Sequence, residues 1–130
     1  MLYLDANVFI YAAINTEAIG EKARALLQKI QQGDQQAATS ALTFDEVFWS
    51  IKKRKPELTS ETSYALLNFP NLEIIPVDRK LALSALIINE YNLAPRDALH
   101  AATAIASKAD CVVSTDAHLD KLKELTRQPL

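Results

Sequence analysis

Four acidic side chains in this sequence could act together on a phosphodiester. They are Asp5, Glu46, Asp97 and Asp116. Two carboxylates about 4 Å apart repel each other by roughly 4 kcal/mol at an effective dielectric constant near 20, so a cluster of four needs a neutralising partner. A ligand set made of oxygen atoms, without cysteine or clustered histidine, selects a hard cation such as Mg²⁺ or Mn²⁺. Such ions activate water for attack on a phosphodiester, and this is the chemistry that the four residues predict.

The apolar pattern predicts a fold in which these four positions meet. Short apolar runs alternate with helical periodicities, which is typical of a three-layer α/β/α sandwich with a short, largely parallel sheet. Asp5 and Asp116 follow predicted strands at residues 2–4 and 111–113, while Glu46 and Asp97 lie in the first turns of predicted helices. Because ligands bind beyond the carboxyl ends of the strands in such sheets, we expect all four carboxylates at that edge.

The other elements follow from the same pattern. Apolar residues recur at helical spacing from Ile19 to Ile30, before Gly33, and from Phe44 to Ile51, before Pro56. We expect further helices over 60–68, 81–91 and 97–107, and strands over 37–41 and 72–77. The alanine-rich segment 97–107 should be buried. No repeat or linker divides the sequence, so residues 1–130 are expected to form a single domain.

Each acidic residue also has a purely structural explanation when it is considered alone. Thr43-Phe44-Asp45-Glu46 fits a capping box, in which Glu46 would bond to a backbone amide. Asp97 suits the dipole of a first helical turn, and Asp116 could cap the helix that follows it. Asp5 is the exception, because a carboxylate at the end of a buried strand has no evident structural role and is costly unless it is paired.

Composition limits the cellular context. The formal net charge of −2 does not favour a nucleic-acid-binding protein, unless bound cations invert the charge where the acidic residues converge. The single cysteine, Cys111, cannot form an internal disulfide, and no apolar run approaches the roughly 18 residues of a membrane span. We therefore expect a soluble, cytoplasmic protein with no membrane association.

Four segments of the sequence resemble the motifs of the PIN-domain nucleases, and within that family those of the toxins of VapBC toxin–antitoxin pairs. In chain order they are Leu4-Asp5-Ala6-Asn7-Val8-Phe9-Ile10-Tyr11, Ser40-Ala41-Leu42-Thr43-Phe44-Asp45-Glu46-Val47, Arg96-Asp97-Ala98-Leu99-His100-Ala101-Ala102 and Ser114-Thr115-Asp116. The resemblance spans nearly the whole chain.

This resemblance implies a PIN-like fold and a metal-dependent endoribonuclease that cleaves single-stranded RNA. It implies that Mg²⁺ or Mn²⁺ is held, directly or through water, by the four acidic residues Asp5, Glu46, Asp97 and Asp116. Asn7 and Thr115 would orient the site. The resemblance also implies a homodimer and a cognate antitoxin that occupies the acidic pocket.

Several neighbouring residues have two interpretations. Asp120 lies one turn beyond Asp116 and could share or replace its role as a ligand. Arg96 could contact a phosphate or form a local ion pair. We interpret His100 as a residue of the helix surface without a catalytic role; the alternative is a partner of the ligands or a proton carrier.

A basic run and a few aromatic residues are also open to two interpretations. Lys52-Lys53-Arg54-Lys55 is typical of a solvated helix end, and the alternative is a role in guiding RNA. Phe48, Trp49 and Tyr11 favour core or dimer contacts, and the alternative is stacking on bases.

Other functions fit the sequence less well. A phosphatase of the haloacid-dehalogenase type needs a second aspartate two residues after Asp5, where Asn7 stands. Gly20 and Gly33 cannot form the glycine-rich loop of a nucleotide-binding fold. The serious alternative is a catalytically silent PIN-like module that binds RNA or protein. Metal-dependent cleavage that disappears in Asp5→Asn would distinguish the nuclease from this module.

Overall fold

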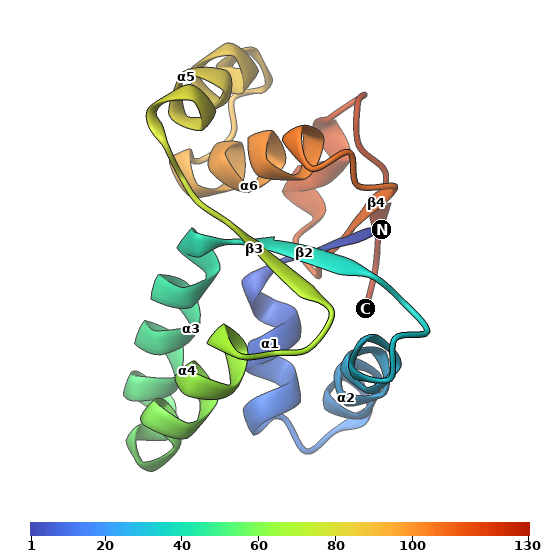
Figure 1. Ribbon diagram of the computed structural model, residues 1–130. Coiled ribbons are helices and arrows are strands. Elements are labelled where there is room, and N and C mark those ends of the chain that lie inside the picture. The colour runs from blue at the N-terminus through green and yellow to red at the C-terminus, as the bar shows by residue number, and fades with distance from the viewer.

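The chain, described by a computed structural model of residues 1–130 except the side chain of Asn89, is built around one parallel sheet (Figure 1). The strands lie in the order β3-β2-β1-β4-β5, and every neighbouring pair is parallel. Their bounds are β1 Leu2–Leu4, β2 Ala37–Ser40, β3 Leu72–Ile75, β4 Cys111–Val113 and β5 Arg127–Gln128. The first four match the predicted strands, whereas the two-residue β5 was not predicted.

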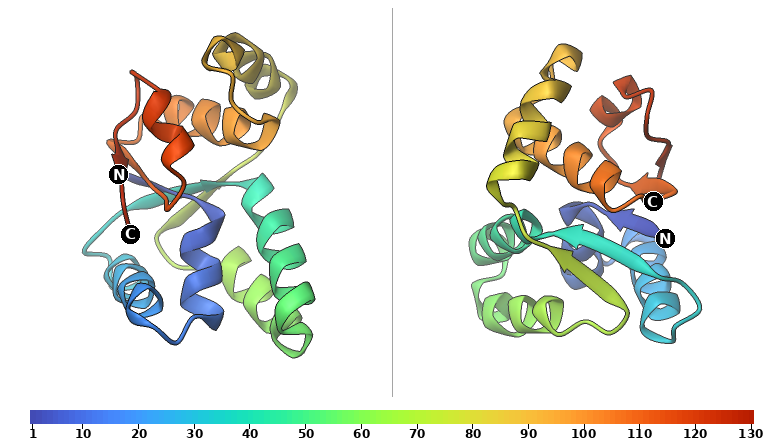
Figure 2. Two further views of the ribbon diagram at one scale, coloured as in Figure 1. Left: turned by 180° about the vertical axis from the view of Figure 1, so that it is seen from behind. Right: turned by 45° about the horizontal axis from the view of Figure 1, so that its top comes forward.

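Helices cover both faces of the sheet and complete the three layers (Figures 1 and 2). On one face lie α1 Ala6–Ile14, α2 Ala18–Gln31, α3 Ala41–Arg54 and α4 Thr59–Leu67. On the other lie α5 Arg79–Ile87 and α6 Pro95–Ala106. Three short 3₁₀ helices, η1 Pro56–Leu58, η2 Ile88–Tyr91 and η3 Ala117–Lys121, lie in the connections. This arrangement confirms the predicted α/β/α architecture. Within the described part of the chain, no helix is both long and apolar enough to cross a membrane.

The helix α1 was not predicted, because its sequence is apolar on nearly every side and shows no single stripe. It packs against both α2 and α3, so several of its faces meet other helices. By contrast, α2 and α3 each carry a clear apolar face, and both match the prediction within a few residues. The helix α3 ends at Arg54, one residue before Lys55-Pro56, as expected from the restriction that proline places on the preceding residue.

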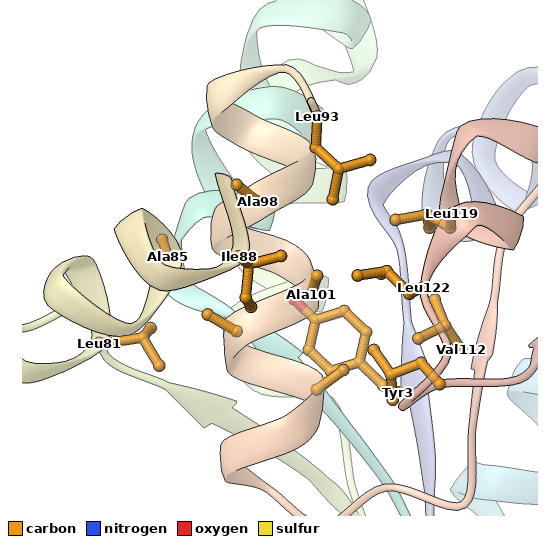
Figure 3. Close-up of a cluster of buried hydrophobic side chains, with 13 residues drawn as sticks. Tyr3, Leu81, Ala85, Ile88, Leu93, Ala98, Ala101, Val112, Leu119 and Leu122 are labelled. Atoms are coloured by element: carbon orange, nitrogen blue, oxygen red, sulfur yellow. The ribbon is translucent and has the colours of Figure 1, made fainter. Parts of the chain in front are cut away.

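The sheet separates two apolar cores, and β1 contributes to both because alternate residues of a strand face opposite sides. Tyr3 lies under α6 among Val112, Leu119 and Leu122, as Figure 3 shows, whereas Leu4 faces the core formed with α1 to α4. The buried residues of α6 are mainly alanines, which allow the helix to approach the sheet closely. This closeness confirms that α6 is a buried element, and it brings the polar side chains of α6 next to the ends of the strands.

Candidate metal centre at the carboxyl edge of the sheet

The four acidic side chains singled out in the sequence lie together beyond the carboxyl ends of β1, β2 and β4. Asp5, Glu46 and His100 offer ligand atoms that all lie within 4.8 Å of one another, and so do Asp97, Asp116 and His118. Asp97 and His100 lie one turn apart on α6, so the two groups adjoin. Burial raises the pKa of Asp97, and the charges of Asp116 and Asp5 raise it further. The acidic residues therefore form one cluster.

Asp5 accepts hydrogen bonds from the start of α1 and from Ser114, which follows β4. Its Oδ1 accepts the backbone N–H of Ala6 at 2.7 Å and so caps α1, while its Oδ2 accepts from Asn7 at 2.7 Å and from the Ser114 hydroxyl at 2.6 Å. The expectation that Asp5 has no structural role was wrong, because α1 begins directly after it. The same bonds also fix the carboxylate in place for a ligand.

Glu46 does not take part in a capping box, so that interpretation was wrong. The helix α3 begins three residues before Phe44, and its cap is Ser40, whose hydroxyl accepts the N–H of Leu42 at 3.1 Å. Thr43 is inside the helix, and its hydroxyl lies 2.8 Å from that of Thr39. Glu46 consequently lies in the second turn, where its carboxylate is free to point into the cluster.

His100 is buried in the cluster, which contradicts its interpretation as a surface residue. Its side chain is 4% exposed, its Nδ1 lies 2.7 Å from the Tyr3 hydroxyl, and its Nε2 contacts the Glu46 carboxylate. A histidine within an alanine-rich helix, on the same face as Asp97, was the sequence signal for this position. Burial lowers the pKa of His100, but the hydrogen bond and charge of Glu46, with the charges of Asp5 and Asp97, raise it overall.

Tyr3 sets the orientation of the imidazole. Burial raises the pKa of the Tyr3 hydroxyl far above its usual value, so this group stays protonated and can donate to Nδ1. In the neutral imidazole the proton then resides on Nε2, which donates to Glu46. His100 thus acts in the structure as a donor that orients Glu46.

Asp116 and Asp120 have different partners. Asp116 Oδ1 accepts the N–H of His118 at 2.9 Å and caps η3, as the structural explanation predicted, yet the carboxylate is also part of the cluster. Asp120 is exposed, and both its oxygens accept from the guanidinium of Arg127, at 2.7 and 2.9 Å, which lowers the pKa of Asp120. The geometry therefore favours Asp116 over Asp120 as the fourth candidate ligand.

The supporting residues differ in how closely they approach the cluster. Asn7 links the ends of β1 and β4, since its Nδ2 donates to Asp5 and to Ser114, and its Oδ1 accepts the backbone N–H of Thr115 at 3.4 Å. The Thr115 side chain is exposed. Arg96 lies 3.7 Å from Asp45, and both side chains are exposed, as expected for a local ion pair. Ser114, which sequence reasoning did not single out, is fully buried between Asp5 and the N–H of Asp116.

The donor chemistry of the cluster fits a hard divalent cation. Four carboxylates converge, and among the described residues none of them forms an ion pair with a lysine or arginine. The buried imidazole of His100 points its Nε2 at Glu46 and can neutralise only one charge. Carboxylate oxygens are the ligands that Mg²⁺ and Mn²⁺ prefer.

Comparison with solved structures shows that other proteins share this fold. The fold is similar to a toxin–antitoxin complex from Klebsiella pneumoniae, with 21% identity, coverage of 97% of this chain and 96% of that chain, and a TM-score of 0.73. It is similar to VapC20 of Mycobacterium tuberculosis, a toxin that cleaves the sarcin-ricin loop, with 13% identity, coverage of 92% and 93%, and a TM-score of 0.75. It is also similar to VapBC2 from Rickettsia felis bound to a fragment of promoter DNA, with 21% identity, coverage of 99% and 98%, and a TM-score of 0.75.

Sequence comparison assigns the family. No curated protein sequence matches the chain. The family model of the PIN domain, however, matches residues 2–125, which include all four acidic positions and every strand of the sheet except β5. The chain belongs to the PIN-domain family.

Proposed function

We propose that this protein is a divalent-metal-dependent endoribonuclease that cleaves single-stranded RNA and acts as the toxin of a toxin–antitoxin pair. The observation that carries the proposal is the convergence of four carboxylates at the carboxyl edge of the sheet. Family membership supports it, as does the similarity of the fold to VapC20, which is described as a toxin that cleaves the sarcin-ricin loop.

The four acidic residues would hold Mg²⁺ or Mn²⁺, directly or through water. When bound, such an ion lowers the pKa of water and offsets the charge that develops on a phosphate. Asp5 presents a carboxylate fixed by Asn7 and Ser114, and Glu46 presents one oriented by His100. Asp97 has a raised pKa, which suits a carboxylate that accepts a proton from the attacking water.

The proposed partners are a cognate antitoxin and a second copy of this chain. The Klebsiella and Rickettsia structures, which are toxin–antitoxin complexes, support an antitoxin. Three apolar side chains of α5, Leu83, Leu86 and Ile87, are each more than half exposed and follow one another at helical spacing. Because such a stripe marks a contact surface, we assign it to the second copy. Sedimentation should show a dimer that Leu86→Glu converts to a monomer; an unchanged mass would refute this assignment.

Cleavage of a labelled single-stranded RNA tests the enzymatic function. We expect the wild type to cleave RNA in Mg²⁺ or Mn²⁺ and not in EDTA. Asp97→Asn should not cleave RNA under any of these three conditions. The matched control is Asp45→Asn. It removes the carboxylate next to Glu46 in the sequence, which is exposed and pairs with Arg96. Cleavage that persists in EDTA would refute the metal mechanism. RNA binding without cleavage, unaffected by EDTA, would favour a silent binding module instead.

A further inference from the structure

The outer face of α3 carries two exposed aromatic rings, and a lysine ammonium lies over each of them. Trp49 is 57% exposed and Phe48 is 38% exposed. The Lys53 ammonium lies 5.4 Å from the centre of the Trp49 ring, and the Lys52 ammonium lies 5.8 Å from that of Phe48. These residues therefore belong to neither core. Of the two roles expected for the aromatic residues, core or dimer contact, the core role does not hold for Trp49, and the dimer role stays a prediction.

The same face concentrates positive charge in an acidic protein. Lys52, Lys53, Arg54 and Lys55 are four of the 14 basic residues of a chain whose net charge is −2. No acidic residue occurs between Glu46 and Glu57 in the sequence. Among the described residues, none of the four cations is in a salt bridge. Their charge is consequently available to an external anion.

This surface is continuous with the candidate metal centre. Glu46, Trp49 and Lys53 are spaced by three and four residues, so they share one face of α3. At 1.5 Å per residue, Trp49 lies about 4.5 Å and Lys53 about 10.5 Å along the helix axis from Glu46. Figure 1 shows α3 leading from the sheet edge, close to the start of α6, toward the opposite end of the molecule. A single strand of RNA that extended from the metal centre along α3 would pass Trp49 and then Lys53.

We propose that this face of α3 binds the single-stranded RNA that flanks the cleavage position, with a base stacked on Trp49 and phosphates on Lys52 and Lys53. The inference rests on the proposed function. Stacking on exposed aromatic rings next to cations is how proteins hold single strands without reading their sequence. A protein partner fits less well, because lysine is depleted in protein interfaces and each ring here has a lysine above it.

Trp49 is the only tryptophan of the chain, so its fluorescence reports on this surface alone. The experiment uses Asp97→Asn in Mg²⁺, which should not cut, titrated with a 12-nucleotide RNA of mixed sequence. If that variant does not fold, the wild type in EDTA serves as a second preparation. We expect the RNA to quench the fluorescence, and a duplex of the same sequence to bind more weakly because its bases are already stacked.

Matched variants separate charge from stacking. Lys52→Gln/Lys53→Gln should reduce the slope of log affinity against log salt by about 1.4, from roughly 0.7 per phosphate contact on a single strand. The control, Lys22→Gln/Lys29→Gln, makes the same charge change at exposed positions on α2 and should leave the slope unchanged. Trp49→Ala should weaken binding about 5- to 150-fold, the equivalent of roughly 1–3 kcal/mol per stacked base, whereas Trp49→Phe should retain most of the affinity.

The outcomes distinguish failure of this inference from failure of the proposed function. The inference about α3 is overturned if the wild type cleaves RNA but RNA does not quench the Trp49 fluorescence, and if the two double lysine variants change the salt dependence equally. The proposed nuclease function would then still stand. Quenching and a reduced slope in a protein that never cuts RNA would support the surface and refute the nuclease. If Trp49→Ala dissociates a dimer in sedimentation, the face is a contact between copies and the inference is overturned.

Discussion

Replacement of Asp97 by asparagine should abolish cleavage and at the same time stabilise the metal-free protein. Asp97 lies beside Asp116 and Asp5, and burial together with their charges raises its pKa, so the folded state disfavours its ionised form. Asparagine keeps the shape of the side chain and removes the charge. Loss of function and gain of stability from one substitution would be the signature of a cluster built to hold a cation.

Two effects on stability oppose each other at this position. At 4.8 Å, the limit for the Asp97 and Asp116 ligand atoms, two charges repel by about 3.5 kcal/mol at an effective dielectric constant of 20. Asp116 is 35% exposed, so solvent screening reduces this repulsion to the order of 1–3 kcal/mol. Against it stands the favourable dipole interaction of Asp97 in the first turn of α6, about 0.3–1 kcal/mol. The repulsion is larger, so a net gain of stability is expected.

Thermal unfolding followed by circular dichroism measures both parts of this prediction. In EDTA at neutral pH, the melting temperature of Asp97→Asn should exceed that of the wild type by several degrees, since 1 kcal/mol corresponds to roughly 2–8 °C in domains near this size. Addition of Mg²⁺ should reverse the order. The wild type gains about 2.7 kcal/mol at 100 times its dissociation constant, while the variant, which has lost a ligand, gains much less.

The pH dependence of stability supplies an independent check. Because the folded-state pKa of Asp97 is raised, the folded protein retains a proton that the unfolded chain releases, so the stability of the metal-free wild type falls as pH rises through this range. His100, whose pKa is also raised, contributes the same sign at higher pH. The variant should lose the acidic part of this dependence. If Asp97→Asn melts at a lower temperature than the wild type in EDTA, the dipole interaction of Asp97 with α6 is larger than the repulsion between the carboxylates. That result would refute the prediction.

Four further substitutions test individual contacts. Asp116→Asn should abolish cleavage, whereas Asp120→Asn should alter the cleavage rate less than about 3-fold, because Arg127 already engages both its oxygens; equal losses would contradict this. Tyr3→Phe should lower the free energy of unfolding by about 1–3 kcal/mol, since it leaves the buried Nδ1 of His100 without a partner, and urea denaturation measures it. Ser114→Ala should weaken Mn²⁺ binding about 10- to 100-fold in calorimetry, because it removes a donor to the carboxylate that follows β1.

The sequence by itself determined most of the strands and helices and placed the four carboxylates near one edge of the sheet, although it missed α1 and β5 and put Glu46 one turn too early in α3. Asp5 directly after β1 and Asp97 in the first turn of α6 follow from local patterns, since apolar runs and helix starts extend over only a few residues. The parallel sheet then places the ends of the strands at one edge, and the predicted cluster forms there. The helix α1 was not predicted, because it contacts other helices on several sides and its sequence therefore has no single apolar stripe.

Only the tertiary structure decided what each polar side chain binds. His100 finds Tyr3 97 residues away and Glu46 54 residues away, and no pattern within one helix specifies those partners. Asp120 is drawn to Arg127 because β5 adds to the edge of the sheet and carries this arginine beside η3. A carboxylate takes the strongest donor that the fold brings within reach, and that donor depends on strand order and helix packing rather than on neighbours in the chain.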